Sequence, residues 1–369
     1  MKLRTKRKMI ILIAILLSLS TGGYLFLEQK QFGQLPTGAR LERIKKSPNY
    51  KDGSFKNLSV TPDLAPDASY WKIMKMYFNK PKNTEPPHSL PFVKTDLKNL
   101  DTSQTQIIWF GHSSYFIKTK GLTILVDPVF SGNASPVSFF GKNYAGSNEY
   151  KISDFPAIDI VLITHDHYDH LDYKTILELK NKAKMFYTSL GVGEHLNLWG
   201  IGNERIVEFD WWEEINFSSD IKFIATPARH FSGRKFKRNQ SLWASYILQT
   251  PSEKIFLGGD SGFDTHFKQI GEKYGPFDLV LLECGQYNKM WPYIHMQPEE
   301  VVQAAQDLKA KVLMPVHWSK FTLALHPWNE SIKRVTAKAK EMQVKTTTPL
   351  IGQLIKLNEN LPDSIWWEF

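Results

Sequence analysis

A dense cluster of metal-ligand side chains directly follows an apolar run, and this feature constrains the fold most. The apolar run spans residues 158–163, and residues 164–170 read Thr-His-Asp-His-Tyr-Asp-His. A buried strand that ends in such a cluster delivers imidazole and carboxylate groups to one edge of a sheet. These are the ligands that Zn²⁺ prefers where no thiolate is offered, and structural zinc sites rely on cysteine. The cluster therefore predicts part of a catalytic metal site rather than a solvated polar loop.

The spacing within the cluster predicts two groups of ligands. Alternate side chains of an extended segment share one face, so His165 and His167 are placed to bind one ion together. Asp169 and His170 follow where the chain turns into the next helix, and we expect them to hold a second ion nearby. The remaining side chains alternate away from the ligand face and are not expected to be ligands: Asp166 and Tyr168.

Three later segments repeat the pattern of an apolar strand that ends in a ligand type. These strands are expected near residues 223–225, 254–257 and 311–314. They are followed by His230, by Asp260 on a glycine-rich turn, and by His317. Loops at one end of a sheet are where sites are built, so we expect the four strand ends to converge on one centre.

Short apolar segments separated by turn-forming residues predict most of the remaining strands. The expected strands span 106–110, 115–119, 122–126, 158–163, 185–187, 221–225, 241–249, 254–257, 277–282 and 311–314. Helical periodicity predicts helices over 172–180, 298–309 and 329–341. Strands and helices mixed in this order favour an α/β fold of two sheets with helices on the outer faces, the αββα four-layer sandwich.

The N-terminal region predicts a single-pass membrane anchor. A basic leader precedes apolar residues 9–27, which approach the ~20 residues that span a bilayer. No small-x-small cleavage site stands out, so we expect an uncleaved signal anchor over 1–27, a linker and N-terminal arm over 28–100, and the catalytic domain over 101–369. The basic leader favours an extracytoplasmic catalytic domain, although four cations would then lie on the same side as that domain: Arg40, Arg43, Lys45 and Lys46.

Composition narrows the classes of partner. The 369 residues are 42% hydrophobic, which is enough for a large core, and carry a net charge of +9 from 46 basic and 37 acidic residues. The basic excess is concentrated in the first 60 residues, and no basic run interleaved with aromatic residues occurs elsewhere. We therefore expect no nucleic-acid partner. The lone Cys284 excludes an internal disulfide and is expected to be a buried strand residue. The sequence does not indicate the oligomeric state.

The order and spacing of the ligand types resemble the metallo-β-lactamase superfamily, over about residues 104–345. The resemblance implies two Zn²⁺ ions per chain, held by two sets of ligands that share a bridging carboxylate: His165, His167 and His230 for the first ion, Asp169, His170 and His317 for the second, and Asp260 between them. Bacterial β-lactamases often place a cysteine at the position of Asp260. Its absence here speaks against antibiotic hydrolysis.

Flanking segments are similar to one branch of the superfamily, N-acylphosphatidylethanolamine-hydrolysing phospholipase D and its bacterial relatives. These segments are 109–114, 126–131, 134–136, 226–230, 259–263, 275–278 and 315–321. The resemblance implies hydrolysis of such a phospholipid to an N-acylethanolamine and phosphatidic acid by a hydroxide held between the ions. It places Asp169 and Asp260 at the catalytic centre and matches His295 to a histidine near the scissile group, where it would donate a proton unless it is an ordinary loop histidine.

Two alternatives stay open. A lactonase, or another hydrolase of a soluble phosphorylated or sugar-acid substrate, would use the same dinuclear site. A membrane-tethered interaction protein would keep the metals for stability alone, but a complete ligand set argues against it. An apolar groove lined from residues 70–78 or 287–293 favours a lipid substrate, whereas a small polar pocket favours a soluble ester.

Supporting roles are expected for several other residues. His112, in a tight Gly-His-Ser-Ser turn, is expected either to orient a metal ligand or to make a structural hydrogen bond. Asp127, at a strand end, is expected to tie together loops beneath the site. Residues 70–78 predict a short amphipathic helix that packs on the domain or lines an apolar access path near the membrane. Four histidines lack such context and are expected at the surface or in local hydrogen bonds: His88, His195, His266 and His326.

Overall fold

Two β-sheets stacked face to face form the centre of the protein. The structure is a computed structural model that describes residues 3–359 and 361–368, so residues 1–2 of the predicted anchor and residues 360 and 369 of the predicted domain lie outside it. The first sheet has the strand order β15 (Leu354–Lys356), β3 (Gln106–Trp109), β4 (Tyr115–Thr119), β5 (Leu122–Val126), β6 (Ile158–Ile163), β7 (Ala183–Ser189) and β8 (Ile206–Phe209). The second has the order β14 (Leu313–Val316), β13 (Leu279–Glu283), β12 (Lys254–Leu257), β11 (Ser245–Gln249), β10 (Lys222–Thr226) and β9 (Glu214–Asn216).

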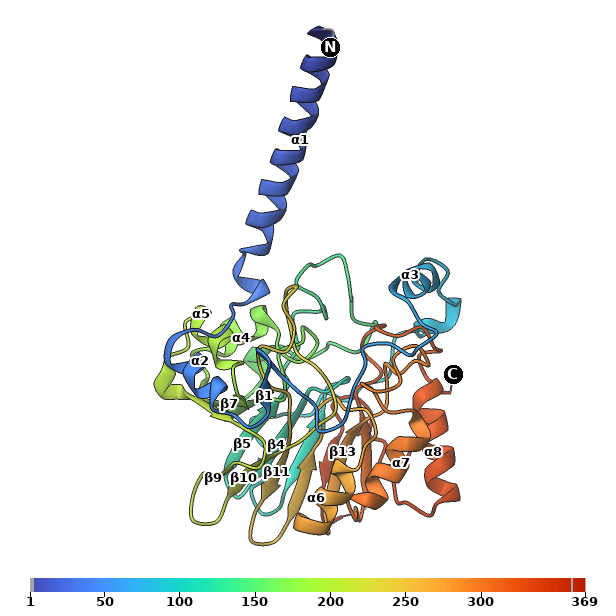
Figure 1. Cartoon of the computed structure of the whole chain (residues 1–369). Helices are drawn as coiled ribbons and strands as arrows, with labels where there is room; N and C mark the ends of the chain where they lie inside the picture. Colours follow the sequence, from blue (N-terminus) through green and yellow to red (C-terminus); the bar gives the residue numbers. More distant parts are fainter. Residues whose placement is uncertain (1–2, 360, 369) are drawn as a thin grey trace.

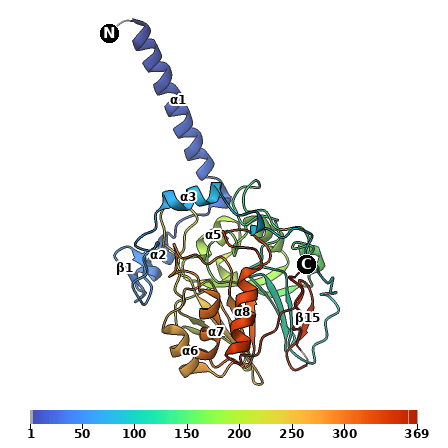
Figure 2. The same cartoon turned by 90° about the vertical axis from the view of Figure 1, so that its right-hand side faces the viewer.

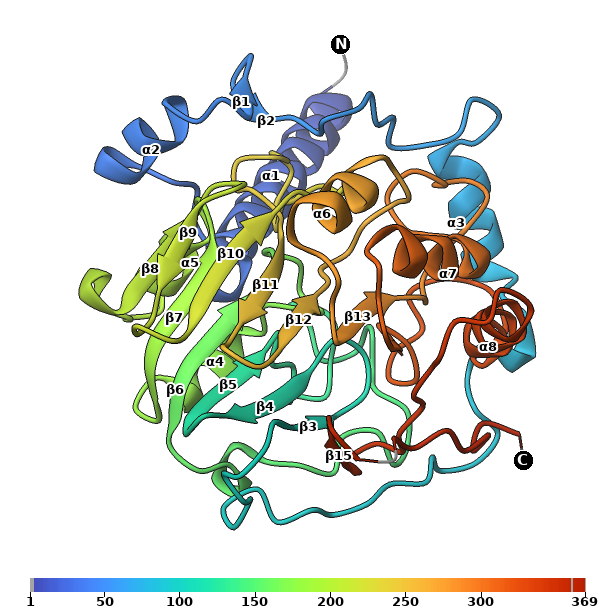
Figure 3. The same cartoon turned by 90° about the horizontal axis from the view of Figure 1, so that it is seen from below.

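Helices cover the outer face of each sheet. The first sheet carries α4 (Tyr173–Leu179) and α5 (Gly193–Leu198). The second carries α6 (His266–Tyr274), α7 (Pro298–Asp307) and α8 (Glu330–Glu341), which lie side by side in Figure 2. Figure 3 shows the second sheet above the first, with α6 and α7 on the side away from the first sheet. The four layers confirm the predicted αββα sandwich.

Alternating burial explains why the strands of the first sheet read as continuous apolar runs. On β6, Ile160 and Leu162 face the core between the sheets, while Val161 and Ile163 face the core beneath α4 and α5. A strand that is buried on both faces needs apolar side chains at every position. β6 pairs in parallel with β5, with Val126 opposite Leu162, so the chain leaves both strands at the same edge of the sheet.

The N-terminal helix α1 (Leu3–Leu27) projects away from the sheets (Figure 1, Figure 2). Its segment Thr5–Leu27 has a mean hydropathy of 2.3, none of it is buried, and it is long and apolar enough to cross a membrane.

The following residues contain η1 (Lys30–Phe32), α2 (Gly38–Lys45), β1 (Tyr50–Lys51), β2 (Ser54–Phe55), α3 (Tyr70–Phe78) and η2 (Lys82–Thr84). α3 confirms the predicted short helix, and the side chains of Ile44 and Phe55 are buried in the core of the sandwich. The predicted domain boundaries at residues 27 and 100 stay predictions. The two remaining short helices are η3 (Ile152–Asp154) and η4 (Asn203–Arg205).

Candidate metal centre

Four strand ends deliver the predicted ligands to one place. The cluster of residues 165–170 follows β6, His230 follows β10, Asp260 follows β12, and His317 comes directly after β14. Although these segments span about 150 residues of sequence, their donor atoms gather in overlapping groups whose members lie within 4.8 Å of one another. The structure therefore brings together all seven predicted ligand residues.

The first group contains three imidazoles and one carboxylate, from His165, His167, His230 and Asp260. His167 Nδ1 lies 2.9 Å from His165 Nε2 and 3.1 Å from His230 Nε2. His230 Nδ1 donates a hydrogen bond to the backbone carbonyl of Ile294 at 2.8 Å, which leaves Nε2 of His230 available as a ligand atom.

The second group contains Asp169, His170 and His317, together with His112. Asp169 Oδ2 lies 3.6 Å from His170 Nε2 and 4.0 Å from His317 Nε2. His112 Nε2 lies 2.8 Å from the same carboxylate oxygen, so His112 holds Asp169 in place, as one of its two predicted roles requires. It also belongs to the group as a fourth donor, which the sequence did not predict.

Asp260 faces both groups, one oxygen to each. Its Oδ2 lies 3.9 Å from His165 Nε2 and 3.7 Å from His230 Nε2. Its Oδ1 lies 3.2 Å from His170 Nε2 and 3.3 Å from His317 Nδ1. This is the arrangement that a carboxylate bridging two cations requires.

The chemistry of the donor set fits bound metal ions. Burial lowers the pKa of His165, His230 and His317 well below its usual value, so their imidazoles are in the neutral form that binds metal. Among the buried atoms of the described residues, His170 Nε2, Asp260 Oδ1 and His317 Nε2 make no hydrogen bond. A buried polar atom without a partner costs about 1–3 kcal/mol, and a cation held by the second group and Asp260 would satisfy all three.

Asp127 organises the loops beneath the second group, as predicted. Its carboxylate is fully buried and accepts hydrogen bonds from Thr164 N, Thr164 Oγ1 and His170 Nδ1 at 2.7–2.8 Å. Burial opposes charge on His170, but the carboxylates of Asp260, Asp169 and Asp127 raise its pKa well above the ordinary value.

Left-handed backbone occurs at three positions around the centre. The φ angles are +52° at His112, +40° at Asp127 and +65° at His317. Such conformations cost non-glycine residues about 1–3 kcal/mol each and persist where the surroundings enforce them. Here they aim the imidazoles of His112 and His317 and the carboxylate of Asp127 at the site.

His295 lies at the edge of the centre and is paired with Glu283. Its Nδ1 is 3.1 Å from Glu283 Oε1 and 4.0 Å from Asp260 Oδ2. Burial would lower the pKa of His295, but the charge and hydrogen bond of Glu283 outweigh it and raise the pKa to about 9. The Glu283 carboxylate therefore favours the protonated form of His295, which can donate. Glu283 is the last residue of β13, and the sequence reasoning assigned it no role.

A cavity of about 280 Å³ opens onto both groups of ligands. His167, Asp169 and His295 form part of its floor. Its walls come from α3 and from several loops, and they are largely apolar: Leu64, Tyr70, Ile73, Phe231, Trp291, Ile294 and Leu323. One cation, Arg238, also lines the cavity. Of residues 287–293, which were predicted to line an apolar groove, Trp291 does so, whereas Tyr287 is hydrogen-bonded to Glu330.

One histidine prediction needs correction. His195 is buried and accepts a hydrogen bond from the backbone N–H of Gln34, 161 residues away, so it is neither at the surface nor locally bonded. Its other nitrogen faces Asp166 at 3.3 Å. His266 is buried and bonds to the nearby Ser261, which agrees with the predicted local hydrogen bond. His88 is exposed, and His326 bonds to the adjacent Pro327 carbonyl.

Comparison with known proteins agrees with this geometry. A family model described as the beta-lactamase superfamily domain matches residues 123–318. An uncharacterised protein of Mycobacterium tuberculosis is 38% identical over 332 residues, 88% of each chain. N-acyl-phosphatidylethanolamine-hydrolyzing phospholipase D 1 of Caenorhabditis elegans is 32% identical over 228 residues, which are 58% of this chain and 64% of that protein. The fold resembles that of Igni18, a metallo hydrolase of Ignicoccus hospitalis, with a TM-score of 0.54 at 18% identity over 69% of this chain and 98% of that one. The chain therefore belongs to the β-lactamase superfamily and has the fold of its metal-dependent hydrolases.

Proposed function

We propose that the protein is a membrane-anchored phosphodiesterase of phospholipase D type that uses two Zn²⁺ ions. Its substrate would be an N-acylphosphatidylethanolamine-like phospholipid, and its products an N-acylethanolamine and phosphatidic acid. The observation that carries this proposal is the cavity, which places an apolar wall for acyl chains directly beside the metal ligands. An apolar wall is the outcome that favours a lipid over a small polar ester.

The residues of the centre divide the work of hydrolysis. The two predicted sets of ligands would hold the ions, with Asp260 facing both. Bound as a pair, such ions supply an activated water and a clamp for phosphoryl oxygens. His295, held by Glu283, is placed to donate a proton to the leaving alcohol. Arg238, which also pairs with Asp63 at 2.9 Å, lines the cavity and offers positive charge to a phosphate group.

The face around α1 supports a location at a membrane. α3 lies on the side of the protein from which α1 projects (Figure 1, Figure 2). Large apolar side chains stand in solvent on α3 and on two nearby loops: Trp71 is 70% exposed, Phe78 84%, Phe139 81% and Phe236 89%. Both loops belong to the same face. Phe140 of one loop stacks on Tyr77 of α3, and Lys235 of the other pairs with Glu28, the residue after α1. Exposed apolar side chains on the face that carries an apolar helix suit insertion into a bilayer.

The proposed topology is a single span with the catalytic domain outside the cytoplasm. The basic residues at the start of α1 favour a cytoplasmic N-terminus. Reaction of a membrane-impermeant label with a cysteine introduced in the catalytic domain of intact cells tests this orientation, and labelling only after the cells are broken would contradict it.

One experiment tests the activity. The full-length protein in detergent micelles is incubated with a panel of phospholipids and lactones, with and without a chelator. We expect chelator-sensitive cleavage of N-acylphosphatidylethanolamine at the bond between phosphate and N-acylethanolamine. Turnover of lactones without turnover of any phospholipid would instead support the soluble-ester hydrolase.

Variants separate the roles of the metal centre and the apolar wall. His167→Ala and Asp260→Asn are expected to abolish hydrolysis while the fold persists, whereas His88→Ala, at an exposed position, serves as the matched control. Retained turnover in a metal-replete His167→Ala protein would contradict the assignment. Trp291→Ser is expected to raise KM for long-chain lipid at least several-fold and to leave a short-chain diester unaffected.

A further inference from the structure

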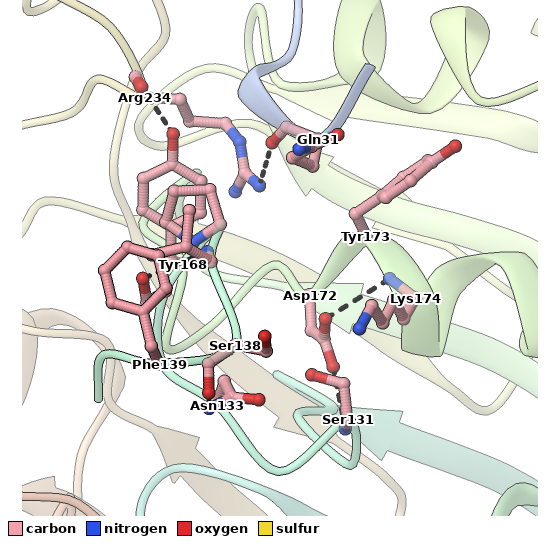
Figure 4. Close-up of a pocket in the computed structure, with 13 residues that line it drawn as sticks. Gln31, Ser131, Asn133, Ser138, Phe139, Tyr168, Asp172, Tyr173, Lys174 and Arg234 are labelled. Atoms are coloured by element: carbon pink, nitrogen blue, oxygen red, sulfur yellow. Dashed lines mark hydrogen bonds between the residues drawn. The ribbon is translucent and has the colours of Figure 1, made fainter. Parts of the chain in front are cut away.

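A second cavity, of about 340 Å³, lies beside the loop of residues 165–170, and Figure 4 shows the residues that line it. The adjacent residues Tyr168 and Asp169 line different cavities, so the loop forms the wall between them. The predicted metal ligands do not line the second cavity, which is bounded instead by polar and basic side chains and by Gln31, four residues beyond the end of α1. The proposed hydrolysis does not use this cavity.

Arg234 places a buried positive charge at this cavity. The residue is 6% exposed, and its guanidinium donates to three backbone carbonyls at 2.8 Å, those of Asp166, Leu171 and Gln31. It lies 4.0 Å from the centre of the Tyr168 ring, which Figure 4 shows beneath it. Among the described residues, no carboxylate forms an ion pair with Arg234, and its Nε–H has no hydrogen-bond acceptor. A buried donor without a partner is costly, so an anion that reached this Nε–H group would bind favourably.

The other charged groups that line the cavity are one cation and one carboxylate. Lys174 is exposed at its edge, and its ammonium group forms no ion pair within the described part of the chain. The cavity's carboxylate, Asp172, is already occupied by three donors: the backbone N–H groups of Ser131 and Lys174 and the hydroxyl of Thr175. Two cations therefore face one carboxylate that accepts three hydrogen bonds already.

We propose that this cavity binds a phosphate ester through Arg234 and Lys174. Phosphate oxygens accept charge-assisted hydrogen bonds from guanidinium and ammonium groups, and hydroxyl groups around the cavity supply further donors. The ester is either the headgroup of an anionic phospholipid or a soluble glycerol phosphate. Gln31 and the exposed Phe139 both border the cavity, which places it where lipid headgroups lie if α1 spans a bilayer. The site is separate from the catalytic centre, and the proposal stands or falls independently of the proposed phospholipase activity.

Chemical protection of Lys174 tests the proposal and identifies the source of the phosphate. The full-length protein is kept in maltoside micelles in phosphate-free buffer, and lysine acetylation by acetic anhydride is quantified by mass spectrometry. One arm adds sn-glycerol 3-phosphate, a second adds phosphatidylglycerol to the micelles, and a third adds glycerol as a neutral control. We expect at least threefold slower acetylation of Lys174 in the first or second arm, while the exposed Lys268 on α6 reacts at an unchanged rate. Protection in the first arm identifies a soluble ester, and protection in the second alone identifies a lipid headgroup. No protection at millimolar concentration in either arm overturns the proposal.

A charge-removing variant provides the second measurement. Lys174→Met is expected to weaken binding of the protecting ligand about tenfold, measured by calorimetry for the soluble ester or by native mass spectrometry for bound lipid. Lys268→Met is the matched control and is expected to bind as the unsubstituted protein does. Because Lys174 is exposed, its substitution does not disturb the core. Unchanged affinity in Lys174→Met would exclude the cavity as the binding site.

Discussion

Replacing Asp127 by asparagine tests how the fold supports the second group of ligands. The carboxylate uses Oδ1 for the backbone N–H of Thr164 and Oδ2 for both the hydroxyl of Thr164 and Nδ1 of His170. Asparagine has the same shape but only one acceptor oxygen, and its NH₂ group cannot accept a hydrogen bond. Whichever way the amide turns, at least one donor of Thr164 or His170 faces another donor.

The structure sets the size of the expected loss. The bond to His170 is charge-assisted, and such a bond contributes about 1.5–3 kcal/mol. Losing a residue that orients a metal ligand typically weakens metal binding about 10- to 100-fold, which is about 1.4–2.7 kcal/mol. The two ranges agree, so we expect the affinity for one of the two proposed Zn²⁺ ions to fall 10- to 100-fold. The other ion, held by His165, His167 and His230, should bind within a few-fold of its usual affinity.

Competition with a chromophoric chelator measures both affinities on the full-length protein in micelles. Asp159→Asn is a matched control, because Asp159 lies near the opposite end of β6 and bonds to Thr123 and Lys184 away from the site. Circular dichroism confirms that each variant is folded. Two ions bound as tightly in folded Asp127→Asn as in the unsubstituted protein would refute the reasoning.

Three further predictions follow from separate features. Burial lowers the pKa of Lys320 to about 7, so between pH 7 and about 10.5 the unfolded chain binds one proton more than the folded protein, and stability rises with pH in that window. In Lys320→Met the slope of unfolding free energy against pH should be lower by up to about 1.4 kcal/mol per pH unit. Parallel curves for the variant and the unsubstituted protein would contradict this prediction. In Gly33→Ala the new Cβ would lie 2.3 Å from His195 Nδ1, on a backbone with φ of +72°, so we expect a lower Tm and increased proteolysis of residues 28–45; a Tm equal to that of the unsubstituted protein would be inconsistent with the close contact. Adding a chelator should lower Tm, because ions that bind only the folded protein stabilise it by about 2.7 kcal/mol when their free concentration is 100 times Kd. A Tm that a chelator does not change would argue against bound metal.

The strands and their ligands were predictable because local patterns encode them. The bounds of β4, β5 and β6 coincide with the predicted segments, since apolar runs bounded by turn residues mark strands buried on both faces. The first cluster of ligands follows β6 directly, so locating that strand locates those ligands. α6 was not predicted, because His266 starts it after Thr265, whose side chain caps no backbone N–H group.

Residues whose roles depend on distant partners escaped prediction. Glu283 ends an apolar run and gains its role only when the fold brings His295 beside it. A charged residue at the end of a strand was the available signal, the same one that identified Asp260. Arg234 lies in a basic, polar segment that is typical of a solvated loop, yet it is buried between Tyr168 and Trp199. His195 depends on Gln34, which lies beyond the reach of any local pattern.

The left-handed backbone at His112, Asp127 and His317 implies a trade-off between robustness and activity. Glycine would relax each of these positions, but it would remove the side chain for which the conformation is maintained. Substitutions that raise thermal stability should therefore be tolerated on the outer helices but not at these three positions. Here every substitution that relieves backbone strain removes a side chain that the site needs.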